Sequence, residues 1–212
     1  MQIHTIEQYL SAGVSLSKAS KAMLMLHGRG ASADSILQLS THLNRNKEIH
    51  FVAPQATQYS WYPHSFLAPT TDNEPFLTSA IATAHHWLVQ LSEAIGSENV
   101  FILGFSQGAC LALETSARFA QRYAGVFGLS GGLIGKQIVE ENYQGNYSQT
   151  PIYLGCSDAD FHIPKERVIE SSKILNSRGG DVRMELYPNM PHTITQYQVN
   201  IINEIIEKSF EA

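Results

Sequence analysis

The sequence predicts an α/β protein with a mostly parallel central sheet and helices on both faces of that sheet. Apolar runs typical of buried strands recur along the chain and alternate with stretches of helical periodicity. Strands that are buried on both faces appear as continuous apolar runs, and each parallel connection needs a crossover segment, usually a helix. One connection, 54–73, is longer and rich in proline and aromatic residues, as segments that carry function often are.

Each predicted element follows from the local pattern. The first predicted strand, 22–27, ends in the glycine-rich turn Gly28-Arg29-Gly30. The second predicted helix, 75–94, is followed by Gly96, a residue that commonly ends helices. Residues 1–16 are expected to add one or two antiparallel edge strands. The predicted strands are 22–27, 49–53, 100–103, 125–129, 152–155 and 182–187, and the predicted helices are 32–43, 75–94, 106–123, 164–178 and 195–208.

Composition and charge exclude several classes of protein. The chain has 212 residues, of which 43% are hydrophobic and 16% charged, and its formal net charge is -5. This length suits one domain, taken as 1–212, and a weakly negative field does not attract nucleic acid or an anionic bilayer. No basic segment followed by an apolar one opens the chain, and no run reaches the ~20 apolar residues of a membrane span. We therefore expect a cytoplasmic protein with no nucleic-acid partner and no stable membrane insertion.

Two G-x-S-x-G motifs follow predicted strands, which is the context of the sharp turn that carries the nucleophile of α/β-hydrolases. The first is Gly104-Phe105-Ser106-Gln107-Gly108 and the second is Gly128-Leu129-Ser130-Gly131-Gly132. Good helix formers follow Ser106, whereas three glycines follow Ser130, and each glycine costs a helix about 1 kcal/mol. Ser106 is therefore the predicted nucleophile, and Ser130 is interpreted as a strand-end residue.

A serine hydroxyl becomes a nucleophile at neutral pH when a neighbouring imidazole takes its proton, so a histidine must lie beside it. In α/β-hydrolases the order along the chain is serine, acid, histidine. His192 follows both other groups and stands in the loop after the last predicted strand. The acid is expected in the loop after 152–155, where Asp158 and Asp160 both stand. From the residues alone, either carboxylate suits the role.

Acyl transfer also needs hydrogen-bond donors for the oxyanion and a pocket for the acyl group. The backbone N–H groups of Gln107 and Arg29 are the predicted donors, because they lie after the nucleophile and in the first strand-to-helix loop. The segment 130–150 is short for a large lid domain, so we expect an open cleft. Its candidate lining residues are Trp61, Tyr62, Phe66 and Phe161.

No cofactor or metal site is expected. Asp158 and Asp160 alone lack the further oxygen ligands that a calcium site requires. Cys110 and Cys156 fall in segments predicted to be a buried helix and a buried strand. We therefore expect two reduced core thiols rather than a disulfide.

Five motifs, in this order along the chain, carry a family resemblance. They are Leu26-His27-Gly28-Arg29-Gly30, Ala53-Pro54-Gln55-Ala56 with the later Trp61-Tyr62, Gly104-Phe105-Ser106-Gln107-Gly108, Asp160-Phe161-His162-Ile163-Pro164 and Met190-Pro191-His192. With them the sequence resembles the phospholipase/carboxylesterase family of α/β-hydrolases, which includes small carboxylesterases and acyl-protein thioesterases. The likeness spans nearly the whole chain.

This resemblance implies a function and resolves the acid. The family's aspartate stands four residues before a proline, a spacing that selects Asp160. The implied activity is hydrolysis of a small-molecule carboxylic ester or thioester through an acyl-serine intermediate, without a cofactor, by a cytoplasmic enzyme that is often a homodimer. Two alternatives remain: a binding protein without catalytic activity on the same fold, and an enzyme like the dienelactone hydrolases, which carry cysteine where this chain has Ser106.

Overall fold

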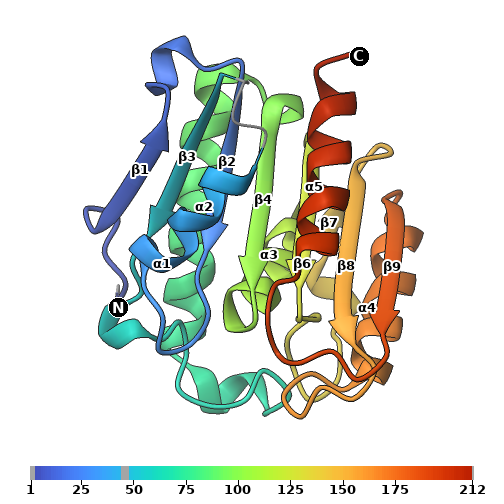
Figure 1. Ribbon diagram of the computed structural model, residues 1–212. Helices are drawn as coiled ribbons and strands as arrows, with labels where there is room; N and C mark the ends of the chain where they lie inside the picture. The colour runs from blue at the N-terminus through green and yellow to red at the C-terminus, as the bar shows by residue number, and fades with distance from the viewer. Residues whose placement is uncertain (1–2, 44–47, 212) are drawn as a thin grey trace.

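The protein is built on a seven-stranded sheet, which we describe from a computed structural model for residues 3–43 and 48–211 (Figure 1). The strand order is β1-β3-β2-β4-β6-β8-β9, and only β1 runs antiparallel to its neighbour. The seven strands are β1 (Tyr9–Gly13), β2 (Lys21–Leu26), β3 (Ile49–Pro54), β4 (Val100–Phe105), β6 (Gly125–Leu129), β8 (Pro151–Ser157) and β9 (Asp181–Tyr187).

Helices cover both faces of the sheet, because the central strands β2, β3, β4, β6 and β8 present buried side chains in both directions. One hydrophobic cluster packs α2, α3 and α4 against one face, and a second cluster packs α1 and α5 against the other. None of the helices in the described residues is long and apolar enough to cross a membrane. The helices are α1 (Ala33–Leu37), α2 (Phe76–Ile95), α3 (Gln107–Arg118), α4 (Lys165–Ser177) and α5 (Gln196–Ser209).

The predicted fold class is confirmed, and two helices differ from their predicted extents. The helix expected over 106–123 ends at Arg118, because Phe119 leaves the helical conformation and starts the short strand β5 (Phe119–Ala120), which pairs with β7 (Gln144–Gly145). The helix expected over 32–43 is only α1 followed by a 3₁₀ turn. At the N-terminus one edge strand forms, and residues 1–2 lie outside the described residues.

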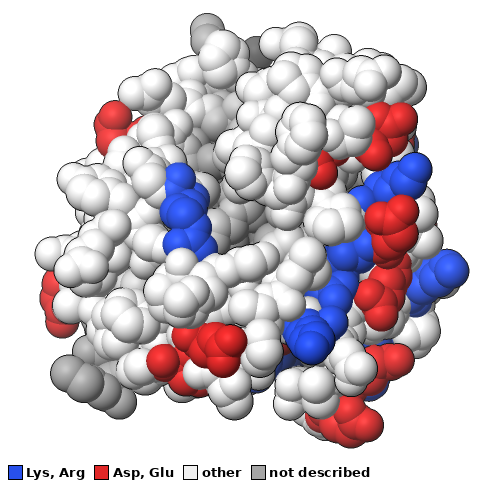
Figure 2. Space-filling model, turned by 90° about the horizontal axis from the view of Figure 1, so that it is seen from below, with Lys and Arg blue, Asp and Glu red and all other residues white. Residues whose placement is uncertain are grey.

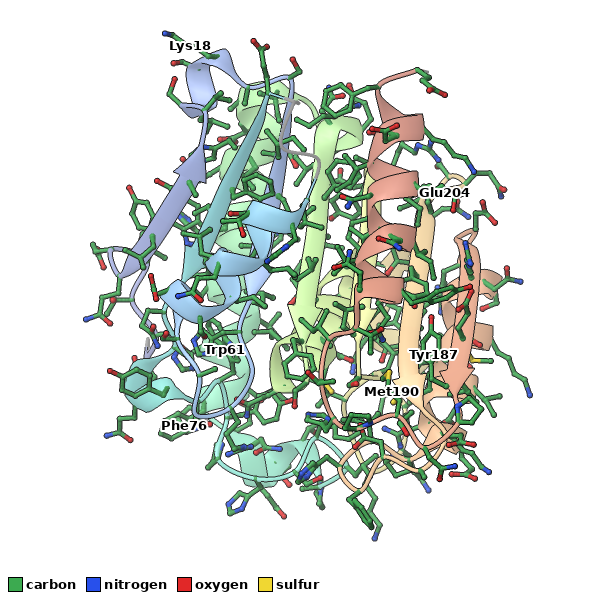
Figure 3. The ribbon with its side chains drawn as sticks, viewed as in Figure 1. Lys18, Trp61, Phe76, Tyr187, Met190 and Glu204 are labelled. Atoms are coloured by element: carbon green, nitrogen blue, oxygen red, sulfur yellow. The ribbon has the colours of Figure 1, made fainter. Side chains whose placement is uncertain are left out.

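Parallel strands place their carboxyl ends at one edge of the sheet, where loops carry function in open α/β folds. Segments far apart in the sequence meet there: Trp61 and Met190 lie toward this edge, while Lys18 and Glu204 lie toward the other (Figure 3). The long connection after β3 runs across this edge and includes two 3₁₀ turns, Thr57–Tyr59 and Thr70–Asn73. The sheet therefore gathers the segments that carry the sequence motifs.

A buried histidine ties the start of this connection to the end of β2. His27 has no exposed surface, its Nδ1–H donates to the Gly28 carbonyl at 2.8 Å, and its Nε2 accepts the Ala56 N–H at 3.1 Å. The indole N–H of Trp61 donates to the His27 carbonyl at 2.9 Å. Because a backbone N–H only donates, the His27 ring must be neutral to accept it.

A second buried histidine, His4, holds the same connection from the other side. Its Nδ1 accepts the Thr57 N–H at 3.1 Å, and its Nε2–H donates to the Trp61 carbonyl at 2.8 Å. Burial lowers the pKa of His4 and outweighs the opposing effect of the Trp61 carbonyl. Protonation of Nδ1 would replace this acceptor with a second N–H donor, which would face the N–H of Thr57. The connection is thus fastened by two uncharged imidazoles.

The first prediction concerns this histidine and pH. The pKa of His4 is lowered in the folded protein, so below about pH 6.5 the unfolded chain binds more protons and stability falls as the pH drops. His4→Gln should therefore flatten the pH dependence of the free energy of unfolding by up to about 1.4 kcal/mol per pH unit. Urea denaturation between about pH 5 and pH 7 measures both slopes, and parallel slopes would contradict the role of His4.

The second prediction concerns the contact between α3 and β2. A methyl group on Gly108 would lie 2.0 Å from the Leu26 carbonyl oxygen, whereas one on Gly28 would meet nothing closer than 3.4 Å. Gly108→Ala should therefore lower the free energy of unfolding by about 2 kcal/mol or more, because backbone has to move. The matched control, Gly28→Ala, should cost much less in the same denaturation experiment. Equal losses would show that the tight contact is not the cause.

Candidate active site

The turn between β4 and α3 holds Ser106 in a rare conformation. Its φ is 55° and its ψ is -119°, a strained arrangement for a residue with a side chain. A methyl group on Gly104 would lie 2.1 Å from the Gly108 carbonyl oxygen. The spacing of glycines around Ser106 therefore follows from how sharply the chain turns. The turn presents the serine side chain at the carboxyl edge of the sheet.

Ser106, His192 and Asp160 form a continuous chain of hydrogen bonds. Nε2 of His192 lies 2.9 Å from Oγ of Ser106, and Nδ1 of His192 lies 2.7 Å from Oδ2 of Asp160. The serine comes from the turn after β4, the aspartate from the loop after β8 and the histidine from the loop after β9. The ring of His192 also packs against Phe105, with centroids 5.1 Å apart. This geometry suits proton transfer from the serine hydroxyl to the imidazole.

The carboxyl group of Asp160 is arranged to stay ionised. Burial alone raises its pKa, but hydrogen bonds from His192 and from the backbone N–H groups of His162 and Ile163 outweigh burial, so the pKa lies below its usual value. The thiol of Cys156 lies 4.0 Å from the same carboxylate. An ionised carboxylate can hold the imidazole in one tautomer and stabilise the imidazolium.

Asp158, the other candidate acid, has a different contact. Its side chain is directed to the backbone of the neighbouring loop, where Oδ1 accepts the Asn189 N–H at 2.9 Å. Asp158 is exposed, whereas the side chain of Asp160 has no exposed surface. Asp158 therefore links the loop after β8 to the loop after β9, and it is Asp160, not Asp158, that hydrogen-bonds to His192.

Ser130, the serine of the second motif, is enclosed. It also has a positive φ, 54°, but it has no exposed surface, and its hydroxyl has no hydrogen-bond partner among the described residues. Its N–H donates to the Gly155 carbonyl at 2.8 Å, which extends the pairing of β6 with β8. A substrate has no access to this hydroxyl.

The predicted oxyanion donors lie on two segments that the connection after β3 holds together. Within the described residues, the backbone N–H groups of Arg29 and Gln107 have no hydrogen-bond partner, and Gln107 is the first residue of α3. The Gln107 side chain accepts the Trp61 N–H at 3.0 Å and donates to the Tyr62 carbonyl at 2.8 Å. These contacts position the start of α3 against the connection.

A cleft of about 510 Å³ opens above Ser106, in the face shown in Figure 2, where a hollow lies among mostly uncharged side chains. Two of the four aromatic residues predicted to line it, Tyr62 and Phe66, do so. The cleft is lined by Arg29, Tyr62, Pro63, His64, Ser65, Phe66, Ser106, Gln107, Cys110, His162, Ile163 and His192.

The other two aromatic residues are placed elsewhere. Trp61 is fully buried beneath the connection, because its indole N–H is held by the His27 carbonyl. Phe161 is fully exposed, because the backbone N–H groups of the next two residues turn toward Asp160 and leave its own side chain in solvent. Neither is among the lining residues. The prediction that these two side chains form the acyl pocket is therefore wrong.

Sequence reasoning missed several lining residues. Cys110 stands on the first turn of α3, four residues after Ser106, and this spacing could have placed it beside the predicted nucleophile. His162 and Ile163 follow Asp160 within the acid loop. No local sequence pattern marks His64 as a lining residue, because its place in the cleft depends on how the whole connection after β3 runs.

Both cysteines are free and buried, as predicted. Burial raises the pKa of the Cys110 thiol to about 12 and that of Cys156 to about 12. Each is therefore a thiol rather than a nucleophilic thiolate at neutral pH. Within residues 3–43 and 48–211, no three His, Cys, Asp or Glu side chains are grouped so that they could hold a metal ion.

Comparison with known proteins identifies the family of this chain. A family model described as Phospholipase/Carboxylesterase matches residues 14–210. The crystal structure of a phospholipase/carboxylesterase from Dyadobacter fermentans DSM 18053 is 40% identical, covers 97% of this chain and 99% of its own, and has a TM-score of 0.93. Acyl-protein thioesterase 1 from Saccharomyces cerevisiae is 24% identical, with 96% of this chain and 99% of that protein aligned.

A more distant structure shares the fold. Esterase PE8 is 22% identical, covers 95% of this chain and 98% of its own, and has a TM-score of 0.79. The mostly parallel sheet and the match over residues 14–210 agree. On this evidence the chain belongs to the phospholipase/carboxylesterase family and has the α/β-hydrolase fold.

Proposed function

We propose that this protein is a serine hydrolase that cleaves carboxylic esters or thioesters through an acyl-serine intermediate. In this proposal Ser106 is the nucleophile, His192 the general base and acid, and Asp160 the residue that orients the imidazole. The observation that carries the proposal is the hydrogen-bonded chain of these three side chains at the floor of an open cleft. The carboxylesterases and the acyl-protein thioesterase among its relatives support the same reaction class.

Acylation begins when Nε2 of His192 removes the proton from Oγ of Ser106. The oxygen attacks the acyl carbon and forms a tetrahedral intermediate, whose negative oxygen accepts hydrogen bonds from the backbone N–H groups of Arg29 and Gln107. Both groups are free of other partners in the described structure. The intermediate collapses as His192 gives its proton to the leaving alcohol or thiol, which departs with the bonding electrons.

Deacylation repeats these steps with water. His192 takes a proton from the water, the hydroxide attacks the acyl-serine, and the proton returns to Oγ of Ser106 as the carboxylic acid leaves. Asp160 stays ionised throughout, because its lowered pKa keeps the carboxylate charged beside the imidazolium. The open cleft admits water without movement of a large lid, since no residue between 130 and 150 lines it.

The cytoplasmic location and the homodimer implied by the family resemblance belong to this proposal as well. Fractionation of the source cells tests the first, and analytical ultracentrifugation tests the second. Two subunits of this 23.5 kDa chain would sediment as a single species of twice that mass. A monomer at every protein concentration would remove the dimer from the proposal.

The third prediction separates the two acidic residues. Asp160→Asn should lower kcat by something on the order of 10⁴-fold, because the amide favours the wrong imidazole tautomer. Asp158→Asn is the matched control, and it should have a far smaller effect because Asp158 bonds to the Asn189 backbone. Steady-state hydrolysis of a short-chain ester measures both variants. A larger loss in Asp158→Asn would reverse the assignment.

The fourth prediction tests the nucleophile directly. A fluorophosphonate should form a stoichiometric adduct with the folded protein, and peptide mass spectrometry should locate it on Ser106. Ser106→Ala should abolish both labelling and turnover while the protein stays folded by circular dichroism. An adduct on Ser130 would overturn the site, and no adduct on folded protein would favour a binding protein on this fold.

A further inference from the structure

Arg29 is the one formally charged side chain among the described residues that line the cleft around Ser106. None of these lining residues is Asp or Glu. The chain as a whole has a formal charge of -5, so acidic side chains are abundant elsewhere.

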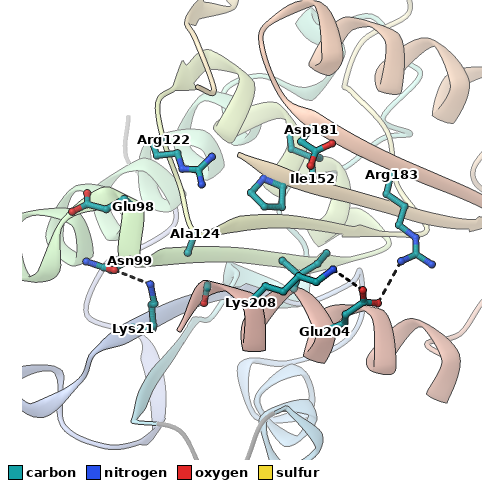
Figure 4. A pocket seen from close by; sticks show the side chains of 13 residues that line it. Lys21, Glu98, Asn99, Arg122, Ala124, Ile152, Asp181, Arg183, Glu204 and Lys208 are labelled. Atoms are coloured by element: carbon teal, nitrogen blue, oxygen red, sulfur yellow. Dashed lines mark hydrogen bonds and ion pairs between the residues drawn. The ribbon is translucent and has the colours of Figure 1, made fainter. Parts of the chain in front are cut away.

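A second hollow, at the opposite edge of the sheet, provides a contrast within the molecule (Figure 4). Its lining includes four basic residues, Lys21, Arg122, Arg183 and Lys208, and three acidic ones, Glu98, Asp181 and Glu204. There the Glu204 carboxylate forms ion pairs with two cations, Lys208 at 2.8 Å and Arg183 at 3.7 Å. Charge in that hollow is largely compensated, whereas charge in the cleft is not.

The guanidinium of Arg29 is held in place by uncharged groups. Nη1 donates to the Pro63 carbonyl at 2.7 Å and to the Ser60 hydroxyl at 3.2 Å, and Nη2 donates to the His64 carbonyl at 2.7 Å. The group also lies over the ring of Tyr62, 5.9 Å from its centroid. These contacts fix its position without neutralising its charge.

Part of the hydrogen-bonding capacity of Arg29 remains. A guanidinium has five N–H donors, and three of them are used by the contacts above. Nε–H and the second Nη2–H have no acceptor among the described residues. A planar group with free donors and a fixed position is suited to a carboxylate, which accepts two parallel hydrogen bonds from arginine.

Two buried carboxylates near the cleft have other partners. Asp160 bonds to His192, and its side chain has no exposed surface. Glu114 is buried behind the cleft, where it pairs with Arg118 at 2.8 Å and accepts the Tyr143 hydroxyl at 3.0 Å. Neither carboxylate is available to Arg29 from within the cleft.

We propose that the cleft selects esters or thioesters that carry a second, anionic group, a carboxylate, and that the Arg29 side chain binds it. This inference rests on the proposed function and narrows it to a substrate class. The backbone N–H of Arg29 would stabilise the oxyanion, while the guanidinium of the same residue binds the substrate's own charge. The short apolar wall of Tyr62, Phe66 and Ile163 then contacts the carbon chain between the two groups.

The test compares esters that differ only in charge. In the first pair the varied group is on the acyl side: monomethyl glutarate carries a carboxylate, and methyl glutaramate carries a neutral amide in its place. In the second pair it is on the leaving group: O-acetylglycolate carries the carboxylate, and O-acetylglycolamide carries the amide. In at least one pair we expect kcat/KM of the wild-type enzyme to be about tenfold higher for the anionic ester than for the neutral one. This ratio corresponds to a free-energy difference of about 1.4 kcal/mol. Added sodium chloride should reduce this ratio. Acid release in a pH-stat measures each rate.

Two variants separate charge from structural damage. Arg29→Gln should bring the ratio of kcat/KM values for the anionic and neutral esters of each pair close to one. The rate of this variant with the neutral ester shows whether the substitution has disturbed the connection after β3. Arg29→Lys should restore part of the preference. Arg178→Gln is the matched control: it removes the same charge from the far end of α4, and the preference should persist in it.

The outcomes distinguish this inference from the proposed function. Equal rates within both pairs, or a preference that survives in Arg29→Gln, would overturn the inference and leave the serine hydrolase in place. A protein labelled on Ser106 by a fluorophosphonate but inactive on all four esters would also overturn the inference alone. A protein that is neither labelled nor active would overturn both.

Discussion

The close approach of α3 to β2 is the constraint on which the site depends. Gly108 brings the start of α3 against the backbone of Leu26, and this contact forces the chain to turn sharply at Ser106. The same approach brings the loop after β2 beside the start of α3. The positions of Ser106, the proposed nucleophile, and of the two proposed oxyanion donors thus depend on one backbone contact, which a single methyl group would disrupt.

Around this contact, the connection after β3 supplies much of the wall of the cleft and is itself held by four side chains. His4 and His27 bind its beginning, Gln107 binds residues 61 and 62, and Arg29 binds residues 60, 63 and 64. Because most of these bonds end on backbone groups, they depend little on which side chains the connection carries. The connection can therefore vary in lining residues while its path is preserved.

The fold and the order of the site residues could be predicted from the sequence, because apolar runs and strand-end loops are local signals. The structure brings Ser106 and His192 within hydrogen-bonding distance, and it distinguishes Asp160 from Asp158, which local patterns alone did not. The cleft lining was less predictable. Trp61 and Phe161 have the composition expected of a pocket, but their directions depend on long-range bonds to His27 and on the turn at Asp160.

The contact of Asp158 with Asn189 has a mechanical consequence. It joins the loop after β8, which carries Asp160, to the loop after β9, which carries His192. The hydrogen bond between Asp160 and His192 joins the same two loops a second time. Joined at two points, these loops are restrained relative to each other, whereas Ser106 stands in the separate turn before α3. Thermal motion should then vary the distance between Ser106 and His192 more than the distance between His192 and Asp160. In the proposed cycle, the imidazole would keep its orienting partner while its distance from the serine oxygen changes.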